Sequence, residues 1–324
     1  MSTNLVKILL FLQSCYQAYE EKRGRGRPLL YSHASMTLFF IIMSIKKIHS
    51  FKSMKSYVDL HYQSFGFEKS PSRKTLRRRF LEQPQLIHWL LPQIARRCQQ
   101  EDYTRFRLNW CFVDKSIFRA LGGLWHKKHR QQGIIPHPSI DTDASWGKSP
   151  YHQWRFGYGL HVICLQNRFP IAATVTTASV KDYTLIEQLL EHLKTMVGII
   201  VGDAGYQCWK IIKNLYQDTG IILQTPKRFK VYLKNKFTKW YNEIIKVPQA
   251  KWLYYKRKPS VEPFFALIKN TYGLEGEKQL PYKGIDKVAA FLMVTTLSMQ
   301  LMMRDNFLNN RELADTKPFI GYFK

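Results

Sequence analysis

Acidic residues are scarce in this sequence. Its 324 residues include 23 Asp and Glu but 50 Lys and Arg, so the formal net charge at pH 7 is +27. A positive excess of this size fits a polyanionic partner, because each phosphate that a protein neutralises releases condensed counterions. We therefore expect nucleic acid rather than an anionic membrane surface, and an RNA-binding protein of the ribosomal kind stays open as a third class.

Cysteine is also scarce and unpatterned. The five cysteines, at positions 15, 98, 111, 164 and 208, include no Cys-x-x-Cys pair, and their number is odd. This usage argues against a disulfide framework and against a cysteine-based zinc site. The pattern predicts buried thiols in a reducing compartment, so we expect a cytoplasmic protein.

Several motifs are missing as well. The sequence has no Walker A loop, Gly-x-Gly-x-x-Gly, His-Glu-x-x-His or Gly-x-Ser-x-Gly pattern, which argues against nucleotide hydrolysis, a zinc protease and a serine-hydrolase elbow. No apolar run reaches the roughly 18 residues of a membrane span. The nearest, 288–303, carries Thr, Ser and Gln and is typical of a buried helix. The N-terminus shows no small-residue cleavage pattern, so we expect no secretory signal and no membrane association.

The first hundred residues have the apolar spacing of helices, which we expect over 36–48, 52–66 and 69–83. Ser70 or Ser72 is the candidate cap of the third helix. Helix, turn and basic helix over 36–83 is the outline of a helix-turn-helix, whose last helix enters the major groove. A solvated basic helix is the alternative. If the outline holds, the DNA contacts come from Arg73, Lys74, Arg77 and Arg78.

A short basic segment precedes these helices. Residues 22–28 contain Arg25-Gly26-Arg27-Pro28, which is similar to an AT-hook. Narrow A·T-rich minor grooves have an enhanced negative potential that attracts inserted arginines, so Arg25 and Arg27 are candidate DNA-binding residues. A flexible basic linker is the alternative. Residues 1–100 are thus predicted to form an α-helical DNA-binding region.

The spacing of apolar residues changes from helix-like to strand-like at residue 107. Three strand-like runs come first, at 108–118, 154–166 and 169–179. They are followed by a helix at 181–194, a strand at 197–203, a helix at 208–220 and a strand at 221–226. This order predicts an α/β fold, a mixed sheet flanked by helices of the RNase H-like kind, over 107–305. A basic, aromatic insertion at 227–258 precedes two further helices, at 259–275 and 284–305. Residues 306–324 are expected to be a C-terminal tail.

Two aspartates end apolar strands. Asp114 follows Trp110-Cys111-Phe112-Val113, and Asp203 follows Ile199-Ile200-Val201-Gly202. If the two strands are neighbours, the carboxylates come together and raise each other's pKa. A divalent cation removes that conflict, and oxygen ligands select Mg²⁺ or Mn²⁺. The sequence therefore predicts a carboxylate metal site containing Asp114 and Asp203.

A third acid is expected from the helix at 259–275. With Ser260 as N-cap, Glu262 lies in the first turn, and Lys269 lies two turns further on the same face. Four other acids are not assigned to the site: Asp141 and Asp143 are interpreted as turn formers in the polar loop 140–149, Asp182 as a helix cap, and Asp218 as solvated. His161, on a strand, is interpreted as a core histidine.

These residues together resemble a bacterial insertion-sequence DDE transposase. The resemblance is carried by 112–116, 201–206 and 255–269, where Tyr255, Lys258, Glu262 and Lys269 fit a Tyr-x₂-Arg-x₃-Glu-x₆-Lys signature. Lys258 departs from the family's arginine and lacks its bidentate fork, although Arg257 is adjacent. The resemblance covers roughly 107–305 and the helical front.

The resemblance implies an RNase H-like catalytic domain in which Asp114, Asp203 and Glu262 are both the catalytic residues and the ligands of two Mg²⁺ or Mn²⁺ ions. It implies cleavage at element ends and strand transfer into target DNA, with Tyr255, Lys258 and Lys269 holding the DNA end. It also implies a nucleoid-associated cytoplasmic protein that acts on terminal inverted repeats as a homodimer. The alternatives are an RNase H-like nuclease without strand transfer and a non-catalytic DNA-binding protein.

Overall fold

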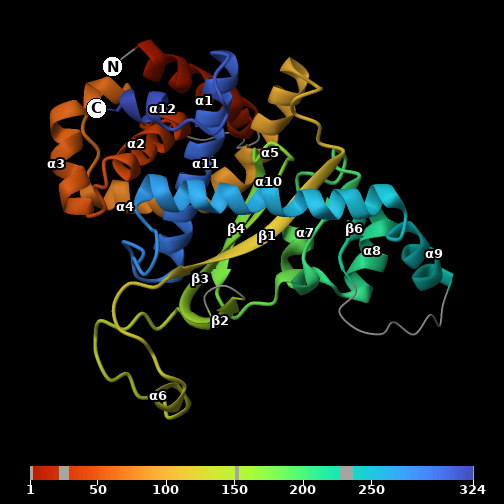
Figure 1. Ribbon diagram of the computed structural model, residues 1–324. Coiled ribbons are helices and arrows are strands. Elements are labelled where there is room, and N and C mark those ends of the chain that lie inside the picture. The colour runs from red at the N-terminus through yellow and green to blue at the C-terminus, as the bar shows by residue number, and fades with distance from the viewer. Residues whose placement is uncertain (1–2, 22–28, 150–152, 227–235, 324) are drawn as a thin grey trace.

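The computed structural model describes residues 3–21, 29–149, 153–226 and 236–323. The segment 22–28, with Arg25 and Arg27, lies outside the described residues. The described chain forms one mixed sheet with helices on both sides (Figure 1), and the N-terminal helices lie together at the end of the molecule where both chain ends lie. The prediction of an α/β fold with a mixed sheet flanked by helices is confirmed.

Six strands make up the sheet among the described residues. They are β1 (Trp110–Arg119), β2 (Ser145–Ser149), β3 (Gln153–Cys164), β4 (Pro170–Thr177), β5 (Ile199–Val201) and β6 (Ile222–Gln224). The order is β2-β3-β1-β5-β6, and β4 also pairs with β3. β1, β5 and β6 are parallel, whereas β2, β3 and β4 join by antiparallel pairing. The parallel part of this sheet contains the strands that lead to Asp114 and Asp203.

Local sequence explains several element boundaries. Asn167 and Arg168 form the predicted hairpin turn between β3 and β4: Arg168 has φ +71°, and Asn167 Oδ1 accepts a hydrogen bond from the Phe169 N–H. Helix α8 (Trp209–Thr219) ends at Gly220, whose φ of +73° gives the left-handed C-cap that glycine adopts without strain. Ser72 accepts a hydrogen bond from the Thr75 N–H and so caps α4 (Arg73–Leu81), as predicted.

The N-terminal helices share a core with the sheet. They are α1 (Thr3–Glu21), α2 (His33–Ile45), α3 (Phe51–His61), the 3₁₀ helix η1 (Tyr62–Phe65), α4 and α5 (Gln83–Glu101). Helix α2 is buried from His33 to Ser44. α5 and α11 (Ile285–Leu308) pack on β4, and α11 also contacts α2. One continuous cluster of buried apolar residues therefore joins the N-terminal helices to the sheet.

The window of α11 that is long and apolar enough to cross a membrane is 78% buried within the fold. The prediction of a buried core helix at 288–303 is confirmed. Three buried polar side chains on α11 bond within the core. Gln300 Nε2 donates to the carbonyls of Leu91 and Pro170, and Thr295 and Thr296 donate to the Leu292 carbonyl.

Four sequence expectations about local structure were wrong. The helix expected from 259 begins at Pro248, because Pro259 and Pro263 are accommodated inside α10 (Pro248–Tyr272). Ser260 is accordingly no N-cap: its hydroxyl donates to the Lys256 carbonyl one turn earlier. The helix expected over 181–194 is reduced to the 3₁₀ helix η2 (Asp182–Leu185) and α7 (Ile186–Leu189). The expected polar loop contains β2.

The remaining elements lie outside the sheet. Helix α6 (Lys127–Gln131) lies on a long excursion between β1 and β2, and α9 (Lys236–Ile244) lies beside α8 (Figure 1). Residues 306–324 include the end of α11 and α12 (Lys317–Gly321), with Phe319 and Phe323 buried. The expected C-terminal tail is therefore packed onto the fold as far as residue 323.

Candidate active site

Asp114 and Asp203 lie at the same edge of the parallel part of the sheet. β1 pairs with β5 in a register that places Phe112 opposite Val201, so each aspartate is two residues beyond a matched pair. The Asp114 carboxylate accepts a hydrogen bond from the Lys115 N–H at 2.8 Å. Asp203 accepts one from the Gly205 N–H at 2.8 Å and so caps η3 (Ala204–Tyr206). The predicted adjacency of the two strands is confirmed.

Burial makes Asp114 an unfavourable place for a negative charge. Its side chain is 15% exposed, and burial raises its pKa to about 6; the nearby Asp203 charge adds to the rise, and Arg257 opposes it. Arg257 Nη1 donates to Asp114 Oδ2 at 2.6 Å. In this structure the guanidinium supplies the positive charge that the carboxylate pair requires. The carboxylate oxygens of Asp114 and Asp203 are the kind of ligand that Mg²⁺ and Mn²⁺ prefer. The two residues therefore fit a divalent ion.

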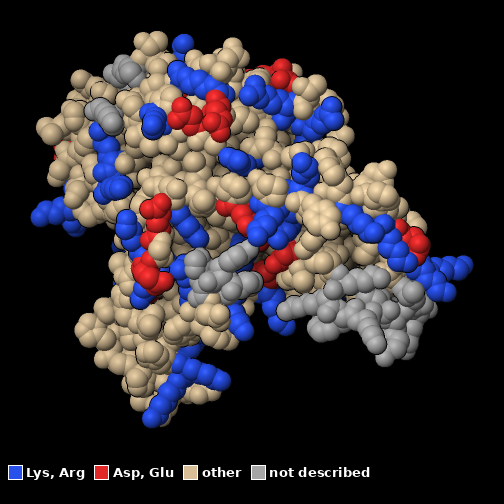
Figure 2. Space-filling model, in the orientation of Figure 1, with Lys and Arg blue, Asp and Glu red and all other residues tan. Residues whose placement is uncertain are grey.

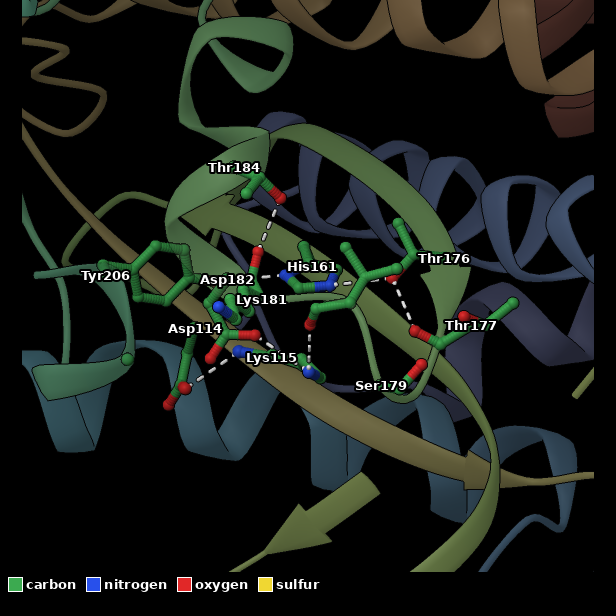
Figure 3. Close-up of polar contacts among 12 residues, drawn as sticks. Asp114, Lys115, His161, Thr176, Thr177, Ser179, Lys181, Asp182, Thr184 and Tyr206 are labelled. Atoms are coloured by element: carbon green, nitrogen blue, oxygen red, sulfur yellow. Dashed lines mark hydrogen bonds and ion pairs between the residues drawn. The ribbon is translucent and has the colours of Figure 1, made fainter. Parts of the chain in front are cut away.

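A third carboxylate, that of Asp182, lies beside Asp203. A Cβ on Gly205 would lie 2.5 Å from Asp182 Oδ2 and 3.0 Å from Asp203 Oδ1, so a larger residue at this position would displace the Asp182 carboxylate. Asp182 Oδ1 accepts a hydrogen bond from Lys115 Nζ at 2.8 Å (Figure 3). Lys115 Nζ also donates to the Val180 carbonyl.

The sequence interpretation of Asp182 as a helix cap was therefore wrong. The cap residue of η2 is Lys181, and the carboxylate of Asp182 faces the site. Nothing in the local sequence pairs Asp182 with Lys115, because 67 residues separate them.

A buried polar chain supports the turn that carries Asp203. Nδ1 of His161 lies 3.3 Å from the Tyr206 hydroxyl, and its Nε2 lies 3.1 Å from Thr176 Oγ1 (Figure 3). Burial, with a smaller contribution from the positive charge of Lys115, lowers the pKa of His161 to about 3, so the ring is neutral. Both of its nitrogens have partners, and the interpretation of His161 as a core histidine is confirmed.

Glu262 lies on α10, the helix that crosses β1 (Figure 1). It is half-buried, and within the described ranges no hydrogen bond or ion pair joins it to Asp114 or Asp203. Helical spacing puts Glu262 on one stripe with Lys258 and Lys269, whereas Arg257 is about 100° away around the axis from Lys258. It is therefore Arg257, and not Glu262, that α10 presents to Asp114 in this structure.

The residues predicted to hold the DNA end differ in exposure. Tyr255 is 76% exposed, which is unusual for a large aromatic side chain, and Lys258 is also exposed. Lys269 is half-buried, with its ammonium 5.4 Å from the centre of the Phe118 ring. Burial and the neighbouring positive charge of Arg155 lower the pKa of Lys269.

The basic face of α4 is open to solvent. Its four predicted DNA-binding residues are all exposed: Arg73, Lys74, Arg77 and Arg78. The next residue, Arg79, is 3% exposed and structural: it donates to the Tyr31 carbonyl and pairs with Glu82. Figure 2 shows acidic side chains near the middle of the face that α10 crosses, with Lys and Arg around them.

Carboxylates at neighbouring strand ends, set in a strongly basic surface, define the class of enzymes that use divalent metal ions on a polyanionic substrate. Residues 112–301 match the family described as the transposase DDE domain, and this stretch is more than half of the chain. The chain belongs to the DDE transposase family and is an enzyme of DNA transposition that works with divalent metal ions.

Solved structures of transposases show limited similarity to the chain. A piggyBac transposase synaptic complex with hairpin DNA is 11% identical, with a TM-score of 0.41, covering 98% of this chain and 76% of that chain. A Mos1 transposase paired-end complex with the left transposon end is 10% identical, with a TM-score of 0.22, covering 83% and 88%. A Mos1 mariner paired-end complex with Mn is also 10% identical, with a TM-score of 0.22, covering 80% and 86%. A comparison with curated proteins gave no match.

Proposed function

We propose that this enzyme cuts DNA at the ends of an insertion-sequence element and joins the freed ends to target DNA. The observation that carries the proposal is the pair of carboxylates Asp114 and Asp203 at neighbouring strand ends, with Arg257 supplying a single positive charge. Glu262 completes the ligand set from α10. The metal is Mg²⁺ or Mn²⁺, with two ions in the catalytic assembly.

The ions, when bound, supply water activation and stabilise charge in an in-line displacement at phosphorus. In cleavage, a water oxygen bonds to phosphorus, the bond to the 3′ oxygen breaks, and a 3′-hydroxyl is left. In joining, that hydroxyl attacks a target phosphodiester, and the target's own 3′ oxygen leaves. One carboxylate site serves both steps, because both are displacements at phosphorus.

The protein's own groups position the site. Lys115 ties Asp182 to the strand that carries Asp114, and the Gly205 N–H fixes the Asp203 carboxylate. In our proposal, α10 rotates or the Glu262 side chain reorients so that Glu262 joins the carboxylate pair, and Arg257 then leaves Asp114. We propose that binding of the element end drives this exchange, with Tyr255, Lys258 and Lys269 contacting the DNA end.

The same proposal assigns DNA binding to the front of the chain. Arg73, Lys74, Arg77 and Arg78 present four exposed positive charges on a capped helix, which fits a helix that enters the major groove. Arg25 and Arg27 are assigned to the minor groove on sequence grounds. The region 1–100 thus binds DNA and 107–305 cuts it, in a homodimer that pairs two element ends at the nucleoid of a bacterial cytoplasm.

Asp203→Asn tests the proposed roles, because it removes metal-binding charge without removing a phosphate contact. With a labelled element end and Mg²⁺, we expect at least a hundredfold loss of nicking and joining while end binding changes by less than about threefold. Asp218→Asn, at an exposed acid on α8, is the matched control and should retain both activities. Equal loss of binding and cleavage in Asp203→Asn would mark Asp203 as structural, and nicking without joining by the wild type would favour the nuclease alternative.

A further inference from the structure

A second group of metal-binding side chains lies outside the carboxylate site. His88 on α5 meets Glu191 and His192, which follow α7, and the ligand atoms of all three lie within 4.8 Å of one another. Nε2 of His88 is 3.4 Å from Glu191 Oε2, and the two imidazole rings are 5.5 Å apart at their centres. The group joins a helix of the N-terminal region to a segment of the catalytic domain.

The hydrogen bonding of His88 prepares it to be a ligand. Its Nδ1 is 3.2 Å from the Ala173 carbonyl oxygen. Because a carbonyl can only accept, Nδ1 carries the hydrogen, and the lone pair of the neutral ring is on Nε2. Nε2 is buried without a hydrogen-bond partner and faces Glu191. A ring nitrogen that donates to a backbone carbonyl is the support that metal-bound histidines ordinarily have.

The donor set selects the kind of metal. Two imidazoles and one carboxylate suit zinc, whereas Mg²⁺ prefers oxygen ligands. Ligand atoms around tetrahedral zinc lie roughly 3.2–3.6 Å apart, given bond lengths of about 2.0–2.2 Å. The Glu191 side chain is 61% exposed and has room for the small rotation that closes the site. Glu191 and His192 also line a cavity of about 660 Å³, which offers an entry path.

We propose that His88, Glu191 and His192 form a Zn²⁺ site, with water as the fourth ligand. The ion joins α5 to the segment after α7 and so ties the N-terminal helices to the catalytic domain. That segment follows η2 and α7, and η2 begins at Asp182, so the same ion restrains the chain that leads away from the carboxylate site. The site is separate from the carboxylate site in both its residues and its metal preference.

Metal uptake by the full-length protein tests the proposal. The protein is held in excess Mg²⁺, which occupies oxygen-ligand sites, then titrated with Zn²⁺, and bound zinc is measured by mass spectrometry after dialysis. We expect one tightly bound Zn²⁺ per chain in the wild type and in Asp203→Asn, whose carboxylate site is altered. Glu191→Gln should weaken zinc affinity at least about tenfold, the loss seen even when an outer partner of a ligand is removed.

The matched control is Glu187→Gln, one helical turn before Glu191 and also exposed. It should bind zinc as the wild type does. Co²⁺ is the spectroscopic probe: the visible bands of four-coordinate cobalt should appear in the wild type and vanish in Glu191→Gln and in His192→Gln. Glu191 is exposed, so its variant is expected to fold, and circular dichroism checks this. Equal zinc uptake by Glu191→Gln and Glu187→Gln, or no tight zinc in the wild type, would overturn the proposal.

Discussion

Replacing Arg257 with glutamine tests whether the guanidinium compensates the charge of the carboxylate pair. In the structure Arg257 donates to Asp114 at 2.6 Å, and both side chains are about 15% exposed. The folded-state pKa of Asp114 is about 6, above its ordinary value of 3.8. The stability that the raised pKa of Asp114 contributes is therefore fully present below pH 3.8, and it is lost as the pH rises through about 6.

The size of the effect follows from the pKa. In folded Arg257→Gln, the Asp114 carboxyl stays protonated above pH 6, because its negative charge would have no compensating positive charge. Holding that proton at about pH 7.5 costs about 1.4 kcal/mol per pH unit above 6, so the extra destabilisation is at most about 2 kcal/mol. Near pH 5 the carboxyl is largely protonated in both proteins, and the charge contribution of Arg257 nearly vanishes. The loss of unfolding free energy in Arg257→Gln should therefore grow by up to about 2 kcal/mol between pH 5 and pH 7.5.

Urea denaturation at the two pH values measures this difference. Lys251→Gln, at an exposed position on the same helix, is the control and should show no pH-dependent loss. Adding Mg²⁺ at pH 7.5 should stabilise Arg257→Gln more than the wild type, because the ion replaces the missing positive charge. An equal loss at both pH values would show that Arg257 acts by packing alone. Equal stabilisation of both proteins by Mg²⁺ would refute the exchange between Arg257 and the metal.

Two further predictions concern the buried histidine and the basic helix. His161 has a folded-state pKa of about 3 against an ordinary 6.5, so its contribution is full above pH 6.5 and is lost as pH falls. Between pH 6.5 and 4.5 the wild type should lose about 2 kcal/mol more stability than His161→Gln, as measured by denaturation, whereas His137→Gln, in an exposed loop, should lose as much as the wild type. Arg77→Gln with Arg78→Gln should lower the slope of log affinity against log salt for an element end by about 2; an unchanged slope would exclude phosphate contacts from that face of α4.

The parallel centre of the sheet could be predicted from the sequence because continuous apolar runs indicate buried strands. The runs before Asp114 and Asp203 form β1 and β5, and the register brings both acids to one edge. The end of α8 at Gly220 and the start of α4 at Ser72 could also be predicted. A left-handed C-cap favours glycine, and an N-cap favours a side-chain hydroxyl, so both signals depend on the residue type itself.

The rest depends on contacts that are distant in sequence. Asp182 is in the site because Lys115 holds it there and Gly205 leaves room for it, and neither residue is a sequence neighbour of Asp182. The start of α10 was misplaced because Pro259 and Pro263 favour a boundary, although the helix continues through both. The relation of Arg257 to Asp114 also depends on how α10 crosses β1, which helical periodicity alone does not determine.

The proposed function requires that Asp114, Asp203 and Glu262 bind the catalytic ions. Crystals of the protein with an element end and Mn²⁺ test it most directly, because manganese is located by its anomalous scattering. We predict a peak about 2.0–2.3 Å from carboxylate oxygens of Asp114 and Asp203, with Glu262 turned toward it in place of Arg257. A fully bound DNA end with no manganese between Asp114 and Asp203, and with Arg257 still paired to Asp114, would contradict the account.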